Sequence, residues 1–145
     1  MRSFGLLLMV ALLATACASS KDDAGQPNLY VYGSGPAEPA PDIDIGTWSG
    51  ATSDGGQATL VLAEDGSGLL CWTTAEKPDK SVLRRVRYRG GILMTENNLK
   101  LAITDAPAGA MKMQTLDATV KYELRSDPDL LLASPACGPV LKKRR

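Results

Sequence analysis

The residues of this chain that could carry covalent or metal chemistry are few. None of its 145 residues is histidine, and its three cysteines are Cys17, Cys71 and Cys137. Ser-His-Asp triads, Cys-His pairs and the usual zinc-hydrolase ligand sets all need imidazole, so they are excluded. Glu64 and Asp65 are adjacent in a predicted turn, whereas glycosidase chemistry needs two carboxylates facing each other across a cleft. We therefore expect no enzymatic activity, no metal and no cofactor.

The overall charge argues against nucleic-acid binding. The chain has 16 lysines and arginines against 16 aspartates and glutamates, so its formal net charge is zero. A neutral chain exerts no general electrostatic attraction on a phosphate backbone. Apolar residues make up 44% and charged residues 22% of the chain, which is typical of a globular protein with one domain.

Residues 1–16 have the organisation of a signal peptide. A positive charge at Arg2 precedes an apolar run over residues 4–13, and small residues follow up to Ala16. This run is too short to span a bilayer, which takes about 20 helical residues. The alternative is an ordinary secretory leader that is cut at an Ala-x-Ala site and leaves Cys17 as an unmodified thiol.

The stretch Leu13-Ala14-Thr15-Ala16-Cys17 resembles the bacterial lipobox, in which a lipid is attached to the cysteine sulfur and the leader is cleaved just before it. The resemblance implies that Cys17 carries acyl chains such as palmitate and anchors the protein to a membrane. Each buried methylene contributes about 0.8 kcal/mol, so no spanning helix is needed. Lipoproteins without Asp directly after the cysteine usually reach the outer membrane. Ala18 and Ser19 follow Cys17, which implies that location.

Residues 17–44 combine the lipidated cysteine with a Pro-, Gly- and Ser-rich tether, whose composition predicts a flexible segment. The exception is an apolar patch over residues 29–32, which we interpret as an edge strand of the domain because Tyr and Val suit a pleated surface. A partner contact, or no role at all, are the alternatives. The domain itself is expected over residues 45–145.

The domain has the alternating pattern of β-strands. Apolar and polar residues alternate over residues 58–63, 82–89, 99–104 and 116–125, and a further short strand is expected over residues 130–133. Gly- and Asp-rich turns separate these segments, and no segment has a sustained helical stripe. About eight short strands predict an all-β antiparallel meander that closes into a small barrel, since closure removes exposed edges. A two-sheet β-sandwich is the alternative.

Two resemblances accompany this pattern. Gly46-Thr47-Trp48 resembles the Gly-x-Trp motif of lipocalins, which implies a lipocalin-like barrel with Trp48 plugging one end. A wider pattern is similar to a group of small proteobacterial lipoproteins that have no established activity. It consists of the lipobox, the Pro-rich tether, Gly46-x-Trp48-x-Gly50, Asp65-Gly66-x-Gly68 with Cys71, and Ala133-Ser134-x-x-Cys137.

Once Cys17 is lipidated, two cysteines remain. An even number of cysteines in a small exported domain usually forms disulfides, so we expect a Cys71–Cys137 bond. On the chain-entropy model such a bond stabilises the fold by roughly 4 kcal/mol. A redox or metal-binding pair is the alternative, but no Cys-x-x-Cys spacing and no histidine supports it.

Candidate contact residues lie on one predicted strand and next to Cys71. Arg85, Arg87 and Arg89, with Arg84 beside them, could form a basic stripe for an anionic partner such as lipid headgroups or polysaccharide phosphates. The alternative is the solvated face of an edge strand. Trp72 is a contact candidate if it points outward; if it points inward, Cys71 faces the C-terminal segment. The basic residues 142–145 could touch a membrane surface or stay solvated.

Three functions remain open. The one we favour is a non-enzymatic, membrane-anchored envelope lipoprotein that binds or supports another envelope component. The second is a lipocalin-like carrier of a small apolar ligand, which requires an interior cavity of a few hundred Å³. The third is a surface-displayed inhibitor of a hydrolase. Lysozyme-inhibitor lipoproteins are the natural comparison, although their Ser-Gly-x-x-Tyr loop does not occur here.

Overall fold

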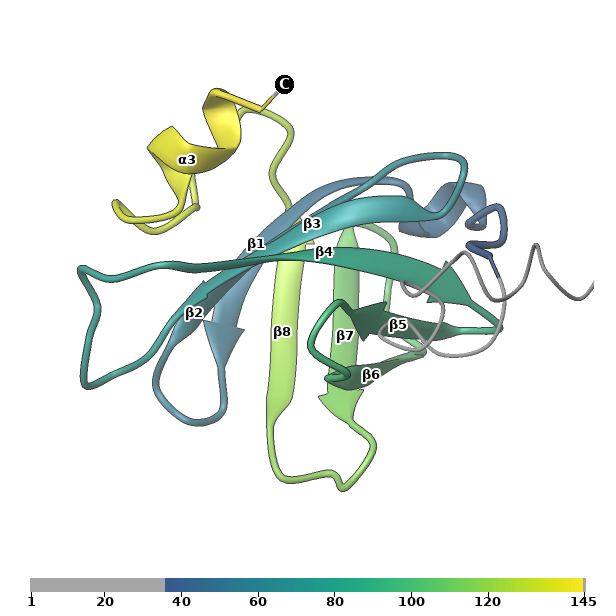
Figure 1. Cartoon of the computed structure of the whole chain (residues 1–145), viewed down its shortest axis with the longest axis horizontal. Helices are drawn as coiled ribbons and strands as arrows, with labels where there is room; N and C mark the ends of the chain where they lie inside the picture. The colour runs from purple at the N-terminus through teal and green to yellow at the C-terminus, as the bar shows by residue number, and fades with distance from the viewer. Residues whose placement is uncertain (1–35, 145) are drawn as a thin grey trace, which may run out of the picture.

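The alternating pattern produces eight strands in the computed structural model, which describes residues 36–144 (Figure 1). Each strand pairs antiparallel with the next, and β1 pairs with β8, so the sheet is a closed barrel. The predicted all-β meander barrel is therefore confirmed, and the sandwich alternative is wrong. The strands are β1 (Gly46–Thr52), β2 (Gln57–Leu62), β3 (Ser67–Thr73), β4 (Val82–Arg89), β5 (Ile92–Thr95), β6 (Lys100–Thr104), β7 (Ala110–Thr115) and β8 (Lys121–Ser126).

Large apolar side chains fill the interior of the barrel. Successive residues of a strand point to opposite faces, so every second residue of each strand points inward. Trp48 lies among these residues with 5% of its surface exposed. Its ring N–H donates to the Asp44 carbonyl at 3.0 Å, in the 3-10 turn η1 (Asp42–Asp44) that leads into β1. The other main interior residues are Leu60, Leu62, Leu70, Val86, Tyr88, Leu93, Leu101, Met111, Met113, Tyr122 and Leu124.

A recurring turn closes three of the four hairpins at one end of the barrel. A buried Thr ends the first strand of each hairpin, and its hydroxyl donates to an Asp or Asn two residues later: Thr52 to Asp54, Thr95 to Asn97 and Thr115 to Asp117. The same hydroxyl accepts the backbone N–H four residues on, at 2.9, 3.0 and 3.1 Å respectively. The residue directly before that N–H has a positive φ in each turn: Gly55, Asn98 and Ala118. Each turn therefore satisfies its own buried polar groups.

Two strand predictions were wrong. The alternation over residues 116–125 is interrupted by the third of these turns, so β8 begins only at Lys121. Leu116 is 55% exposed, and Ala118 has φ 58°. No strand forms over residues 130–133: residues 131–133 are bends, and Leu130 has φ 58°. A short helix, α3 (Gly138–Lys142), follows Cys137 although no helix was expected; Pro139 lies in its first turn, where a missing N–H costs nothing.

The domain begins before the predicted boundary at residue 45. The backbone N–H of Glu38 donates to the Tyr88 carbonyl at 2.9 Å, and that of Ala40 donates to the Glu64 carbonyl at 3.1 Å. Ala40 is 8% exposed and belongs to the core. Residues 38–44 are thus part of the folded body, because backbone pairing holds a segment whose composition alone predicts disorder. Cys17 and the patch at residues 29–32 lie outside the described residues.

Candidate functional site

The outer face of β2, β3 and β4 carries a groove of about 610 Å³. The outward side chains of these strands line up across the sheet because Val61 pairs with Leu69 and Leu69 pairs with Arg85. Two residues before Leu69, at the start of β3, Ser67 pairs with Arg87. The resulting surface has an apolar floor, Val61 and Leu69, both half-buried, and arginines along one side.

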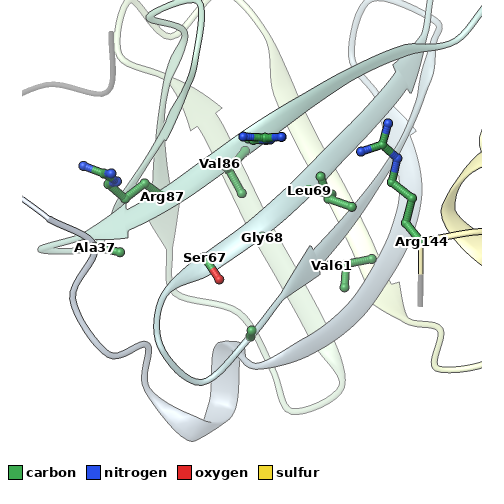
Figure 2. A pocket seen from close by; sticks show the side chains of 10 residues that line it. Ala37, Val61, Ser67, Gly68, Leu69, Val86, Arg87 and Arg144 are labelled. Atoms are coloured by element: carbon green, nitrogen blue, oxygen red, sulfur yellow. The ribbon is translucent and has the colours of Figure 1, made fainter. Parts of the chain in front are cut away.

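Arg144 adds a third arginine to this groove from the end of the chain. It follows α3, and its backbone N–H donates to the Leu141 carbonyl at 3.1 Å. Figure 2 shows Arg87 near Ala37 at one end of the groove and Arg144 beside Val61 and Leu69 at the other. We call the surface lined by Ala37, Val61, Leu69, Arg85, Arg87 and Arg144 the basic groove.

The predicted arginine stripe is divided by the fold. Arg85 and Arg87 line the basic groove, whereas Arg89 holds the N-terminal segment. The Arg89 guanidinium lies 3.8 Å from the Glu38 carboxylate and donates to the Pro36 carbonyl at 3.1 Å. Arg84 lies on the alternate face of β4, and its guanidinium donates to the Leu83 carbonyl at 2.9 Å. Two of the four arginines of the stripe therefore contribute to one site.

Trp72 takes the inward orientation of the two that the sequence left open. It is partly buried and packs against the barrel core, so the outward aromatic contact is not formed. Cys71, on the opposite face of β3, is fully buried and bonded to Cys137 with an S–S distance of 2.12 Å. The expected disulfide is therefore present, and it fixes the C-terminal segment to the outside of the barrel.

The C-terminal segment (residues 127–144) packs on the outer face through its own small core. Leu130 and Leu141 lie beside the disulfide, with Val61, Leu69 and Leu83 below them. The Asp127 carboxylate, 3% exposed, accepts the backbone N–H groups of residues 131 and 132 at 2.7 and 3.0 Å. This packing positions Arg144 at the basic groove.

The acidic pair of the sequence has a structural explanation. The Asp65 carboxylate accepts the hydroxyl and the backbone N–H of Ser67, at 2.6 and 2.9 Å, in the β2–β3 turn. These hydrogen bonds lower the pKa of Asp65 from its ordinary value. Glu64 contributes its carbonyl to the N-terminal segment. Within residues 36–144, no group of three or more potential metal ligands comes together.

Two other clefts have different character. A groove of about 540 Å³ lies on the opposite side of the barrel, over β1, β7 and β8, and is lined by both charges, Lys112, Glu123 and Arg125 among them. A cleft of about 250 Å³ lies near η1, lined in part by Asp44, Tyr88 and Met111, and is smaller than typical ligand pockets of about 300–1,000 Å³. Burial raises the pKa of Asp44.

The sequence identified Arg85 and Arg87 but missed the rest of the basic groove. The floor residue Leu69 was not among the candidate contact residues, and Arg144 was considered only as one of the basic residues 142–145. Their convergence depends on the disulfide and on α3. The even pair Cys71 and Cys137 was the one signal that could have placed the basic tail beside β3.

Comparison with known proteins identifies the fold but no family. No family model matches the sequence, and no curated protein matches it. Lipoprotein YedD from Klebsiella pneumoniae is 15% identical, with 75% of this chain and 90% of that chain covered and a TM-score of 0.52. A lipocalin lipoprotein affecting virulence in Streptococcus pneumoniae is 17% identical, with 63% and 100% covered and a TM-score of 0.48. At these identities the YedD likeness concerns the barrel fold alone. No helix within residues 36–144 has the length and apolarity needed to cross a membrane.

Proposed function

We propose that this protein is a non-enzymatic lipoprotein of the bacterial envelope that binds another envelope component through the outer surface of its barrel. The observation that carries the proposal is that the interior of the barrel is filled by side chains, whereas its outer surface has grooves. The interior is occupied by side chains such as Leu60, Leu93 and Leu101, which have no exposed surface. Two grooves of ligand-binding size, one over β2, β3 and β4 and one over β1, β7 and β8, lie on the outside of the barrel.

The anchor is the acylated sulfur of Cys17, and we assign the outer membrane because Ala18 and Ser19 follow it. The lipobox-like stretch supports the acylated anchor, and a protein with the same barrel fold, YedD, is described as a lipoprotein. Mass spectrometry of the N-terminal peptide tests the anchor directly. We expect a mass increase for acyl chains on Cys17, and a Cys17→Ser variant that is no longer lipidated. An unmodified thiol in a protein that washes off membranes with buffer would refute the anchor.

Affinity capture from detergent-solubilised membranes tests the binding role. We expect the lipidated protein to retain an envelope component that an unrelated bacterial lipoprotein of similar charge, used as the control bait, does not retain. Native mass spectrometry of the same preparation separates the alternatives, since a carrier would retain a small apolar molecule. Such a molecule inside the barrel would contradict the proposal, because the interior side chains would have to move aside for it. A captured hydrolase that loses activity would favour the inhibitor instead.

A further inference from the structure

We propose that the basic groove is a docking surface for the phosphate headgroups of anionic lipids in the membrane that holds the anchor. The inference deepens the proposed function and rests on it for the anchor. The outer face of β2, β3 and β4, which carries the basic groove, would contact the membrane and orient the domain on the bilayer.

The groove has the donors that phosphates require. Arginine presents its N–H groups as a rigid fork that binds phosphate oxygens in pairs. Arg85 and Arg144 are exposed and Arg87 is half-buried, so all three side chains reach solvent. Arg144 lies beside Val61 and Leu69, and Leu69 pairs with Arg85, so this apolar floor supports the stems of two of the arginines and leaves their charged ends outside.

The basic residues of the groove outnumber the carboxylates near it. Glu38 pairs with Arg89, and Asp65 accepts two hydrogen bonds from Ser67 but keeps its negative charge. Two more carboxylates lie nearby: Glu64 follows the lining residue Ala63, and Glu96 accepts the backbone N–H of Arg85 at 3.3 Å. Against these, Lys142 and Lys143 are exposed directly before Arg144 and add two positive charges at the same end. The local charge is therefore positive although the chain is neutral.

The groove also lies close in sequence to the proposed anchor. Ala37 lines the groove, and residue 17 precedes it by 20 positions. A chain of that length spans at most about 70 Å even when fully extended. The anchor therefore keeps the groove near the bilayer at a high effective concentration. This proximity favours lipid headgroups over a soluble protein or a polysaccharide as the occupant.

Vesicle co-sedimentation tests the docking surface without the anchor. Residues 18–145 contain the closed barrel, its core and the disulfide, so this exported chain keeps the folded domain. The probes are phosphatidylcholine vesicles with and without phosphatidylglycerol. We expect binding only to the anionic vesicles. Each basic residue near such a surface contributes about a fivefold factor in affinity, so the Arg85→Gln/Arg87→Gln/Arg144→Gln variant should bind on the order of a hundredfold more weakly.

The matched control removes the same charge from residues outside the described grooves. Lys77→Gln/Lys100→Gln/Lys121→Gln changes three exposed residues and should bind within a few-fold of the unmodified protein. A second variant with lysine at the three groove positions keeps the charge and should retain most of the binding. It also remains informative if the glutamine variant is poorly folded.

Three results would overturn the inference. They are equal binding to neutral and anionic vesicles, equal losses in the groove and control variants, and full suppression of vesicle binding by inorganic phosphate at the concentration of the lipid headgroups. The last would assign the groove to a soluble anion. Because residues 18–145 lack Cys17, none of these results depends on lipidation, and failure of the anchor would be seen only in the mass of the N-terminal peptide.

Discussion

Removing the Cys71–Cys137 disulfide should destabilise the whole barrel, because the loop that it closes contains strands β4 to β8. The two cysteines are 66 residues apart. For a loop of that length the chain-entropy model gives about 4 kcal/mol at 25 °C. Both side chains are buried, so truncation to alanine also removes packing against Leu130 and Leu141, at a further cost of about 1 kcal/mol. We expect Cys71→Ala/Cys137→Ala to lose about 5 kcal/mol of unfolding free energy.

Urea unfolding followed by the fluorescence of Trp48 and Trp72 measures this loss. Both tryptophans contact the barrel core, so their signal reports on the barrel itself. The unmodified protein treated with a reducing agent is the control, and it should show most of the same loss. A double variant within about 1 kcal/mol of the unmodified protein would refute the reasoning. The reasoning would also be refuted if only the backbone amides after Asp127 lost hydrogen-exchange protection, because the disulfide would then stabilise the C-terminal segment alone.

Three further predictions concern the turns, the N-terminal segment and pH. Thr115→Val should lower the unfolding free energy by about 1–3 kcal/mol, because the N–H of residue 120 loses its acceptor and that of residue 119 keeps only the Asp117 carboxylate; Thr115→Ser should keep most of the stability, and equal losses would contradict this. Gly66→Ala should release residues 36–40 to proteolysis, because its Cβ would lie 1.9 Å from the Glu38 carbonyl oxygen at a φ of +85°; unchanged cleavage would exclude that contact. Burial, and to a smaller extent the charge of Asp54, raise the pKa of Tyr122 above 10.0. Folding stability should therefore fall as the pH rises through 10.0, where the unfolded state ionises first, and Tyr122→Phe should fall less steeply in alkaline urea titrations.

The strands were predictable where burial of one face produces strict alternation. Leu60 and Leu62 on β2, and Val86 and Tyr88 on β4, are buried as their spacing indicated. The same rule failed over residues 116–125, because alternation continued by chance through a turn. The hydrogen bonds of Thr115 and Asp117 decide the conformation there, and they repeat the Thr-x-Asx spacing of the other two hairpins. Comparison of the three segments within the sequence would have revealed it.

The site was less predictable than the strands because it depends on contacts between distant segments. Alternation shows that Arg85 and Arg87 share a face but not what lies next to that face. Nothing in the composition near Arg89 indicates that Glu38 and the Pro36 carbonyl occupy its guanidinium. Period-two spacing likewise separates Cys71 from Trp72 without saying which of the two is inside.

Pairing between β1 and β8 has a consequence for how the domain folds as the chain emerges from its N-terminal end. A chain that has emerged only as far as β7 presents two unpaired strand edges, and these can pair with other chains. The seam joins residues that are far apart in sequence, so it forms late and slowly compared with the hairpins. Cys137 emerges later still, so the disulfide with Cys71 forms after all eight strands of the barrel are available. Mispaired intermediates should thus accumulate when the chain is truncated before Lys121.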